Sequence, residues 1–212
     1  ATLDRTQSKY VTGAQAFWHT PLDGLRVGAT YLRASIDFHL TLSPELRAVA
    51  VAAGLVAADF DGKVIVSQRP DTLIVGSAEY NRDDWLFAAE YSRWLKHQRT
   101  TLPAAFPTID EDGERFYAMA TRRATAWLEA GAYYSVYHVD AGDRGGHDPQ
   151  LAEPFYAFQR DLAATVRFDV NDHWLWKLEA HFMDGTAGLP APSNPHPERY
   201  WGLFLARTTV TF

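Results

Sequence analysis

The chain has 212 residues, 47% of them hydrophobic and 14% aromatic, with a formal net charge of -6 and no cysteine. An acidic chain without clusters of lysine and arginine is unsuited to nucleic acid, because phosphate binding needs such clusters. The lack of cysteine excludes disulfides and thiolate metal sites. The longest nearly apolar run, residues 48–58, is too short to cross a bilayer as a helix.

Two strands are predicted first along the chain, over residues 10–19 and 25–39, with the turn Thr20-Pro-Leu-Asp-Gly24 between them. Their alternation of polar and apolar residues is weak, so it does not fix which side chains share a face. Residues 1–5 lack the basic and then apolar pattern of a signal peptide. We therefore expect either a mature chain or part of a longer one.

A short helix is predicted over residues 43–58, where the alternation of the strands breaks off. Ser43 suits the N-cap, Pro44 the first helical position, and Glu45 the positive end of the helix dipole. The helix belongs to a connection between strands. Three placements are open: a lid over a pore, a loop folded into it, or an ordinary surface helix.

The middle of the chain adds four predicted strands, at residues 72–80, 85–94, 114–122 and 126–139. In the second of these, Trp85 and Phe87 fall on one side and Glu90 on the other. The third alternates weakly, so its register is also open. Turns are predicted at residues 81–84 and 123–125.

The clearest period of two lies in the last three predicted strands, at residues 159–170, 174–183 and 200–212. The middle one of these places aromatic residues on one side and charged or imidazole side chains on the other: Trp174, Trp176 and Phe182 against Lys177, Glu179 and His181. Counting back in twos from Phe212 gives an apolar row that includes Phe204, whereas Arg207 falls in the other row. This pattern is typical of strands with one apolar and one polar face.

Strands of about ten residues with an apolar outside and a polar inside are how a transmembrane β-barrel satisfies its backbone. The predicted connections alternate between tight turns and long loops, as in barrels with short periplasmic turns. We therefore predict an all-β fold, a transmembrane antiparallel β-barrel with one short loop helix. The predicted lipid-facing residues are Trp85, Phe87, Phe168, Trp174, Trp176, Phe182, Phe204 and Phe212. The predicted pore-lining residues are Glu79, Glu90, Glu129, Asp161, Arg167, Asp169, Lys177, Glu179, His181 and Arg207.

About nine strands are counted, and an odd number cannot close into an antiparallel barrel. Either a strand at residues 63–69 has been missed, or residues 1–212 are the C-terminal part of a larger barrel. A barrel of about eight strands is filled by side chains, whereas one of about 16–18 encloses a channel. The charged interior rows and the long loops favour the larger barrel, with residues 1–212 as a single β-barrel domain or the C-terminal part of one.

Three segments resemble a known family: residues 158–189, 77–93 and 127–137. They look like the hairpins in the C-terminal region of Gram-negative outer-membrane porin-like proteins, the group that includes phosphate-selective porins. The resemblance covers roughly Thr72 onward, and the terminal Phe212 looks like the signal that such barrels present to their insertion machinery. It implies passive movement of small hydrophilic solutes. No ladder of basic residues matches a phosphate site.

The predicted interior row contains more carboxylates than cations, and a wall of one sign attracts the opposite ion. A mild cation preference is one interpretation; the other is that the charges pair across strands, for example Glu179 with Arg207. The segment Asp140–Asp148 has oxygen and histidine donors but fits an external loop better than a metal site. No metal, cofactor or catalytic residue is predicted.

A diffusion porin in the outer membrane of a Gram-negative bacterium is the predicted function, either as a monomer or as a homotrimer. The expected partners are outer-membrane lipid, the insertion machinery and small hydrophilic solutes. The alternatives are a closed barrel with a structural or adhesion role, and an outer-membrane hydrolase in which His181 pairs with Asp184 and Ser92 or Ser135 is the nucleophile. A soluble lipocalin-like or sandwich fold would bury the apolar rows instead.

Overall fold

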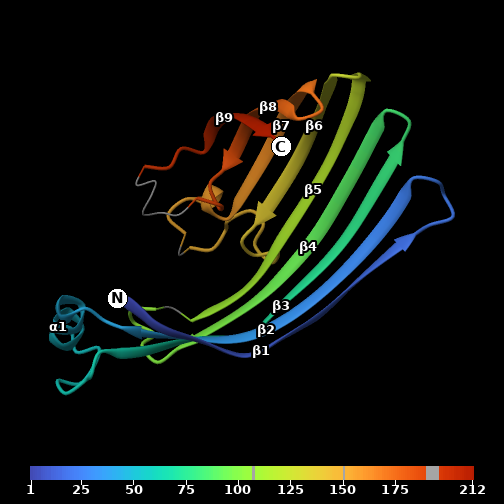
Figure 1. Cartoon of the computed structure of the whole chain (residues 1–212). Coiled ribbons are helices and arrows are strands. Elements are labelled where there is room, and N and C mark those ends of the chain that lie inside the picture. The colour runs from blue at the N-terminus through green and yellow to red at the C-terminus, as the bar shows by residue number, and fades with distance from the viewer. Residues whose placement is uncertain (107, 150, 190–195) are drawn as a thin grey trace. The chain divides into compact units, whose positions relative to one another are not determined.

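Nine antiparallel strands form one sheet in the computed structural model, which describes residues 1–106, 108–149, 151–189 and 196–212. Each strand is hydrogen-bonded to the next along the chain, so the sheet is a meander (Figure 1). The strands are β1 Thr2–His19, β2 Leu25–Thr41, β3 Lys63–Arg82, β4 Trp85–Thr100, β5 Ile109–Thr125, β6 Leu128–His138, β7 Phe158–Asn171, β8 Trp174–Gly185 and β9 Tyr200–Val210. The helices are α1 Pro44–Ala52 and the single 3-10 turn η1 Pro154–Tyr156.

The chain divides into two compact units. The first unit contains residues 1–14, 31–74 and 94–112, and the second contains residues 15–30, 75–93 and 113–212. Strands β1 to β5 contribute to both units, whereas β6 to β9 belong to the second unit alone.

The predicted number of strands is confirmed, but several strands are longer than the sequence pattern indicates. Residues 63–69 are not a separate strand, because β3 runs from Lys63 through Pro70 to Arg82. Just after this proline, Asp71 Oδ1 accepts a hydrogen bond of 3.2 Å from the backbone N–H of His97. The strand therefore passes a residue that usually interrupts a sheet.

Two predicted strand boundaries need correction. Strand β9 ends at Val210, so Phe212 lies beyond the strand and is not a lipid-facing position of it. Trp127 lies in the turn between β5 and β6, where its ring stacks on Phe168 at 6.3 Å between centroids. It therefore does not belong to the alternation of β6.

Short turns join β1 to β2, β3 to β4, β5 to β6 and β7 to β8, and all of them lie in the second unit. Asp83 adopts a φ of 54°, a left-handed conformation that aspartate tolerates in tight turns. In the β7–β8 turn, Asn171 Oδ1 accepts a hydrogen bond of 2.9 Å from the backbone N–H of His173. The β3–β4 turn, which contains Asp83, falls where the sequence predicted it.

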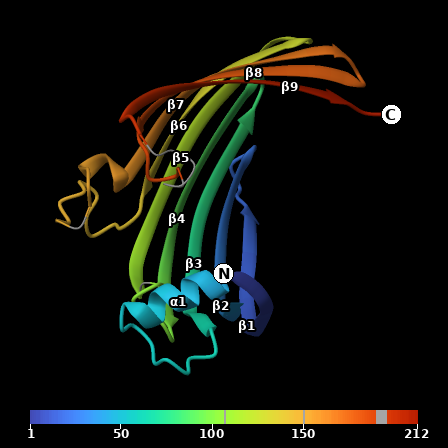
Figure 2. The same cartoon turned by 90° about the vertical axis from the view of Figure 1, so that its left-hand side faces the viewer.

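A small hydrophobic core lies in the first unit, at the ends of β2 and β3 and in the connections beside them. Leu42, Val64, Val66 and Leu102 are buried there, and Phe38, Leu40, Val56, Phe60 and Phe106 pack against them. Helix α1 lies in the connection between β2 and β3, in the same unit (Figure 2). Its N-cap is confirmed, since Ser43 Oγ accepts a hydrogen bond from the backbone N–H of Leu46.

Helix α1 ends at Ala52, not at residue 58 as predicted. Gly54 adopts a φ of 70°, a left-handed conformation that ends helices. The residues beyond it supply Val56 and Phe60 to the core of the first unit. The apolar run was therefore read as helix although its second half is an irregular segment that packs against the strands.

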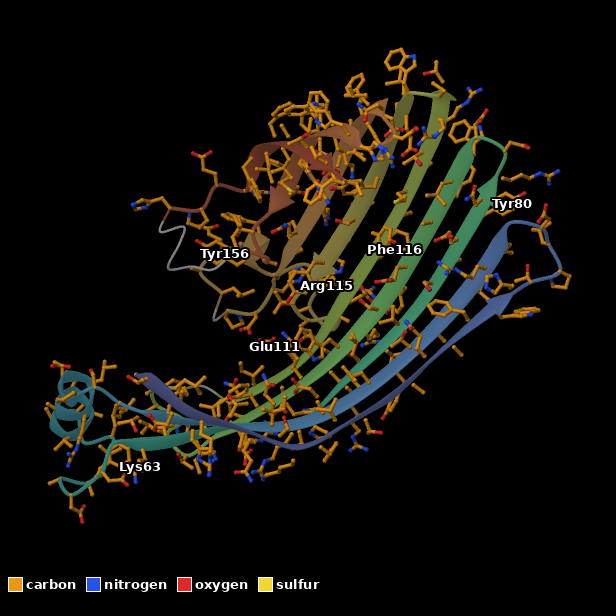
Figure 3. All side chains as sticks on the ribbon, in the orientation of Figure 1. Lys63, Tyr80, Glu111, Arg115, Phe116 and Tyr156 are labelled. Atoms are coloured by element: carbon orange, nitrogen blue, oxygen red, sulfur yellow. The ribbon has the colours of Figure 1, made fainter. Side chains whose placement is uncertain are left out.

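The second unit has one apolar face and one polar face on β6 to β9. The registers place Phe168 opposite Trp176 and Phe182 opposite Gly202, so these residues share the face that we call the apolar face. Successive residues point to opposite sides of the sheet, as Arg115 and Phe116 do on β5 (Figure 3). The face that carries Glu129, Thr165 and their cross-strand neighbours is the polar face.

Exposure is inverted relative to a water-soluble sheet. On the apolar face, Phe182 is 66% exposed and Phe204 67% exposed. On the polar face, Asp161 is 8% exposed and His181 7% exposed. The soluble sandwich, which would bury its apolar rows, does not describe this arrangement.

Gly131 on the polar face is packed too closely to carry a side chain. A Cβ there would lie 2.5 Å from the carbonyl oxygen of Ala120 and 2.6 Å from Thr121 Cγ2, whereas a Cβ at Gly76 would meet nothing within 4 Å. We predict that Gly131→Ala lowers the free energy of unfolding by about 1–3 kcal/mol, as overpacking does, and that Gly76→Ala does not lower it. Denaturant unfolding in lipid vesicles, followed by tryptophan fluorescence, measures both. Equal stability of the two variants would contradict the packing described.

Candidate functional site: the polar face of the second unit

The structure brings eight of the ten predicted pore-lining residues onto one face of β6 to β9. The registers set them in adjacent rows, so they form a continuous polar surface: Glu129, Asp161, Arg167, Asp169, Lys177, Glu179, His181 and Arg207. The other two, Glu79 and Glu90, lie on β3 and β4 and line a separate hollow in the same unit.

One cross-strand row of this face is charged at every position. Arg123 on β5, Glu129 on β6, Arg167 on β7, Lys177 on β8 and Arg207 on β9 lie directly opposite one another. Such a row would repel itself without carboxylates close by, because like charges that face each other destabilise a sheet.

Asp169 joins two of these cations. Its carboxylate lies 2.8 Å from Arg123 Nη1 and 2.8 Å from Arg167 Nε. Glu129 adds a longer contact of 3.4 Å to Arg123. Removing the Asp169 charge would leave Arg123 with the longer contact to Glu129 and Arg167 without an ion pair in the described ranges.

The prediction that Glu179 pairs with Arg207 is wrong. Glu179 lies opposite Leu205, and its carboxylate pairs with Lys177 on its own strand at 3.1 Å. Residues two apart on a strand share a face, so this pairing needs no partner strand. In the described part of the chain, Arg207 has no hydrogen bond or ion pair.

Sequence reasoning missed two cations of the polar surface, Arg26 and Arg123. Arg123 was assigned to a turn because β5 was expected to end at residue 122, whereas it continues to Thr125. Arg26 lies on β2, whose register the weak alternation did not fix, and its Nη2 lies 3.0 Å from Glu79. With these two included, the six predicted carboxylates face five cations, so the predicted acidic excess nearly disappears.

An array of three side chains lies on the polar face, in which Asp161 and His181 are buried and Tyr133 is half-buried. His181 Nδ1 is 3.0 Å from Asp161 Oδ2, and the Tyr133 hydroxyl is 3.3 Å from the same nitrogen. The tyrosine and imidazole rings meet edge to face at 5.7 Å. These contacts satisfy polar groups that would otherwise be costly to bury.

The predicted pairing of His181 with Asp184 is wrong. Asp184 lies on the other face of β8, where it binds Arg160 at 2.9 Å and Arg199 at 2.7 Å. Ser135 lies opposite Asp161 in the register, not beside the imidazole. The hydroxyl that contacts His181 is the phenol of Tyr133, so the nucleophile, base and orienting acid of a hydrolase are not assembled around His181.

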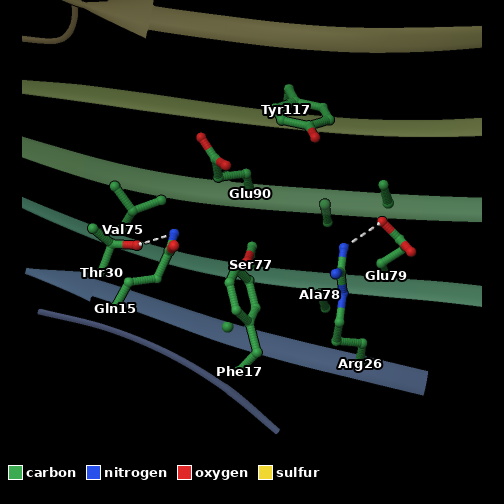
Figure 4. Close-up of a pocket in the computed structure, with 13 residues that line it drawn as sticks. Gln15, Phe17, Arg26, Thr30, Val75, Ser77, Ala78, Glu79, Glu90 and Tyr117 are labelled. Atoms are coloured by element: carbon green, nitrogen blue, oxygen red, sulfur yellow. Dashed lines mark hydrogen bonds and ion pairs between the residues drawn. The ribbon is translucent and has the colours of Figure 1, made fainter. Parts of the chain in front are cut away.

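Two hollows in the second unit are lined by strand residues alone, and another borders the β1–β2 turn. One of about 160 Å³ lies beside Thr165, Arg167 and Lys177. Thr165 is buried, and its Oγ1 is the buried side-chain atom without a hydrogen-bond partner in the described ranges. The other, of about 220 Å³, is lined by residues of β1 to β5 and is drawn in Figure 4.

The β6–β7 loop is held to the sheet by Arg144. Its guanidinium binds both oxygens of Glu114, at 2.8 Å from Nε and 2.7 Å from Nη2, and this ion pair raises the pKa of Arg144. Tyr91 and His138 also bind the Glu114 carboxylate, at 2.9 Å and 3.2 Å. The loop therefore has a fixed attachment to β5.

The segment Asp140–Asp148, which has the composition of a metal-binding loop, is organised by its own hydrogen bonds. Asp143 accepts from the backbone N–H groups of His147 and Asp148, each at 2.8 Å, and these donors lower the pKa of its carboxyl. Within the described ranges, no three or more histidine, aspartate or glutamate residues are placed to hold a metal ion.

The predicted lipid-facing residues within strands lie in two groups, one on β7 to β9 and one on β4. Phe168, Trp176, Phe182 and Phe204 share the apolar face of β7 to β9. On β4, the rings of Trp85 and Phe87 stack at 5.4 Å. Trp174 begins β8, and its Nε1 donates to Thr208 Oγ1 at 2.8 Å.

Comparison with known proteins gives little. No family model and no curated protein matches the chain, so the resemblance to porin-like proteins stays a prediction. Among solved structures, the chain is similar to the CymD monoaromatic hydrocarbon channel, with 11% sequence identity and a TM-score of 0.49. The match covers 93% of this chain and 63% of that channel. No helix in the described part of the chain combines the length and the apolar character needed to cross a membrane.

The Asp161–His181 pair allows a direct test of the polar face. Because both side chains are buried and contact each other, we predict that Asp161→Asn and His181→Gln are non-additive, with a coupling free energy of about 1–3 kcal/mol. A double-mutant cycle on unfolding in vesicles measures this coupling. The control cycle combines Asp161→Asn with Glu129→Gln, two residues that make no hydrogen bond or ion pair with each other in the described ranges, and should be additive. Additivity in both cycles would show that the pair does not form.

Proposed function

We propose that the chain forms part of an outer-membrane β-barrel channel through which small hydrophilic solutes diffuse passively. The observation that carries this proposal is the inverted exposure of β6 to β9, where Phe182 and Phe204 are exposed on one face while Asp161 and His181 are buried on the other. Water-soluble monomers rarely expose apolar patches of this kind. A bilayer supplies the apolar surroundings that these side chains need.

The dimensions of the strands support a membrane position. Strands β8 and β9 have 12 and 11 residues, close to the nine to eleven that cross the hydrocarbon core at the usual tilt. Their apolar face is continuous, because Phe182, Ala180 and Leu178 lie opposite Gly202, Phe204 and Ala206. Tryptophans occur at the start of β4 and of β8, where an interfacial girdle would place them.

The two edge strands of the sheet, β1 and β9, bear on how many strands the complete barrel has. The strand order ends at β1 and β9, and no pairing joins these two strands in the described ranges. Unpaired backbone groups are not tolerated in hydrocarbon. We therefore include in the proposal that further strands close the barrel, in a total of about 16–18, as an aqueous channel requires.

The environment and partners of the channel follow from the same proposal. Lipid contacts the apolar face, and small hydrophilic solutes contact the polar face. Phe212, the last residue, is the proposed signal to the insertion machinery of a Gram-negative outer membrane. We propose no enzymatic activity, since His181 is engaged by Asp161 and by the Tyr133 phenol.

A closed barrel with a structural or adhesion role is the second candidate. The observation that favours it is the number of ion pairs on the polar face, such as Arg123 and Arg167 with Asp169 and Lys177 with Glu179. Paired charges can fill a narrow interior. They can also line a wide one, so conductance separates the two candidates.

The complete natural protein, refolded in detergent and added to a planar bilayer, tests the proposal. We predict stepwise increases in current in 1 M KCl and release of a small dye from vesicles, because the polar face would border a water-filled lumen. Protein that is folded by circular dichroism and by heat-dependent migration on gels, but carries no current and releases no dye, would favour the closed barrel.

A further inference from the structure

Ion pairing divides the charges of the second unit into two groups. Every carboxylate predicted to line the pore has a partner, apart from one. Glu79 binds Arg26, Asp169 binds Arg123 and Arg167, Glu129 binds Arg123, Glu179 binds Lys177, and Asp161 binds His181. Glu90 has no hydrogen bond or ion pair with any residue in the described ranges. A paired charge exerts little net field at a distance, so the unpaired one has the greater effect on a passing ion.

Glu90 is half-buried and lies in the hollow of about 220 Å³ that β1 to β5 form within the second unit. We call it the Glu90 hollow. Figure 4 shows Glu90 on β4 and Tyr117 on the adjacent β5, with Ser77 on β3 and Phe17 on β1. At one end Gln15 donates to Thr30 at 3.0 Å, and at the other Arg26 binds Glu79 at 3.0 Å.

The hollow exists because small residues form its floor. Gly28, Ala78, Ala88 and Ala89 all line it. A Cβ at Gly28 would lie 2.8 Å from the ring of Phe17 and 2.7 Å from Ser77 Oγ. The phenylalanine ring therefore lies over the glycine backbone, which gives an apolar surface inside a polar lining.

The charge of the lining is negative. Arg26 is the cation of the hollow, and it is neutralised by Glu79 and lies 5.0 Å from the centre of the Phe17 ring. This leaves the Glu90 carboxylate as the uncompensated charge. Acceptor oxygens of Ser77 and Gln15 and the ring of Tyr117 complete the surroundings.

This combination suits one class of ligand. A primary ammonium group has three N–H donors and one positive charge, which a carboxylate, hydroxyl and amide oxygens can receive. Aromatic faces add attraction for a cation. An anion would meet the Glu90 charge without compensation, and a neutral solute would gain little from it.

We propose that the Glu90 hollow binds the ammonium group of small organic cations in transit, and that Glu90 determines the preference of the channel for cations. The inference rests on the proposed channel function. The solute class is small organic cations. Glu90 is the decisive charge because the other predicted pore-lining carboxylates are already paired.

Reversal potentials of the complete channel in a KCl gradient test the proposal, together with block of the K⁺ current by butylammonium. In Glu90→Gln, the cation-to-anion permeability ratio should fall about fivefold, as expected for one unscreened charge at short range in water, and butylammonium block should weaken by a similar factor. Glu90→Asp keeps the charge and should retain both properties.

Asp172→Asn is the matched control, because it removes the same charge from the exposed turn between β7 and β8, outside the hollow. It should leave the permeability ratio and the block unchanged. A conducting channel in which Glu90→Gln behaves like Asp172→Asn would overturn the inference while leaving the channel intact. A folded protein without any current would instead overturn the channel itself.

Discussion

The backbone hydrogen-bond ladder of a sheet fixes which side chains share a face, and the rest of the structure depends on this constraint. Because side chains alternate, each strand of β6 to β9 presents two surfaces of different chemistry. The registers then align these surfaces across four strands, so that Phe168 faces Trp176 on one side and Arg167 faces Lys177 on the other. A shift of one residue would exchange the two faces. The apolar and polar surfaces are therefore specified together.

Burial of charge on the polar face has a second consequence. Groups such as Asp161 and His181 lose contact with water, and each needs a partner within the protein. The structure provides partners locally: Asp169 serves two arginines, and Lys177 and Glu179 pair along one strand. This pairing lowers the number of charges that can act on a solute. It is the reason that Glu90, which lacks a partner in the described ranges, stands out among the carboxylates.

Much of the sheet could be predicted from the sequence, because a strong alternation of polar and apolar residues identifies a strand and its two faces even when the pairing with neighbouring strands is unknown. Strands β8 and β9 were placed with the correct faces since tryptophan and phenylalanine recur at every second position. Where alternation is weak, as in β1, β2 and the first half of β3, lengths were underestimated. The first half of β3 contains Pro70, which is unfavourable in a strand, and Val64 and Val66 are both buried in the small core of the first unit. Neither strand propensity nor a period of two therefore marks this half of the strand in the sequence.

The contacts of the candidate site were less predictable than its residues. Cross-strand partners depend on register and on which rotamers reach each other, and a sequence contains neither directly. Thus His181 was assigned to the polar face, but its partner Asp161 lies 20 positions away and was not identified. Arg123 was missed because a strand end shifted by three residues, from 122 to 125. An error of three residues in a strand boundary leaves the predicted fold unchanged, but it is enough to miss an ion pair.

The most direct test of the central claim measures the surroundings of individual side chains. The chain has no cysteine, so a single introduced cysteine can carry one nitroxide label. In vesicles, labels at Phe168, Leu178 and Phe204 should collide readily with dissolved oxygen and poorly with a water-soluble nickel complex, as expected for acyl-chain contact. Labels at Lys177 and Arg207 should show the reverse. If the first three sites were inaccessible to both reagents, in a protein that stays dispersed without detergent, the apolar face would be a protein core and the account would be wrong.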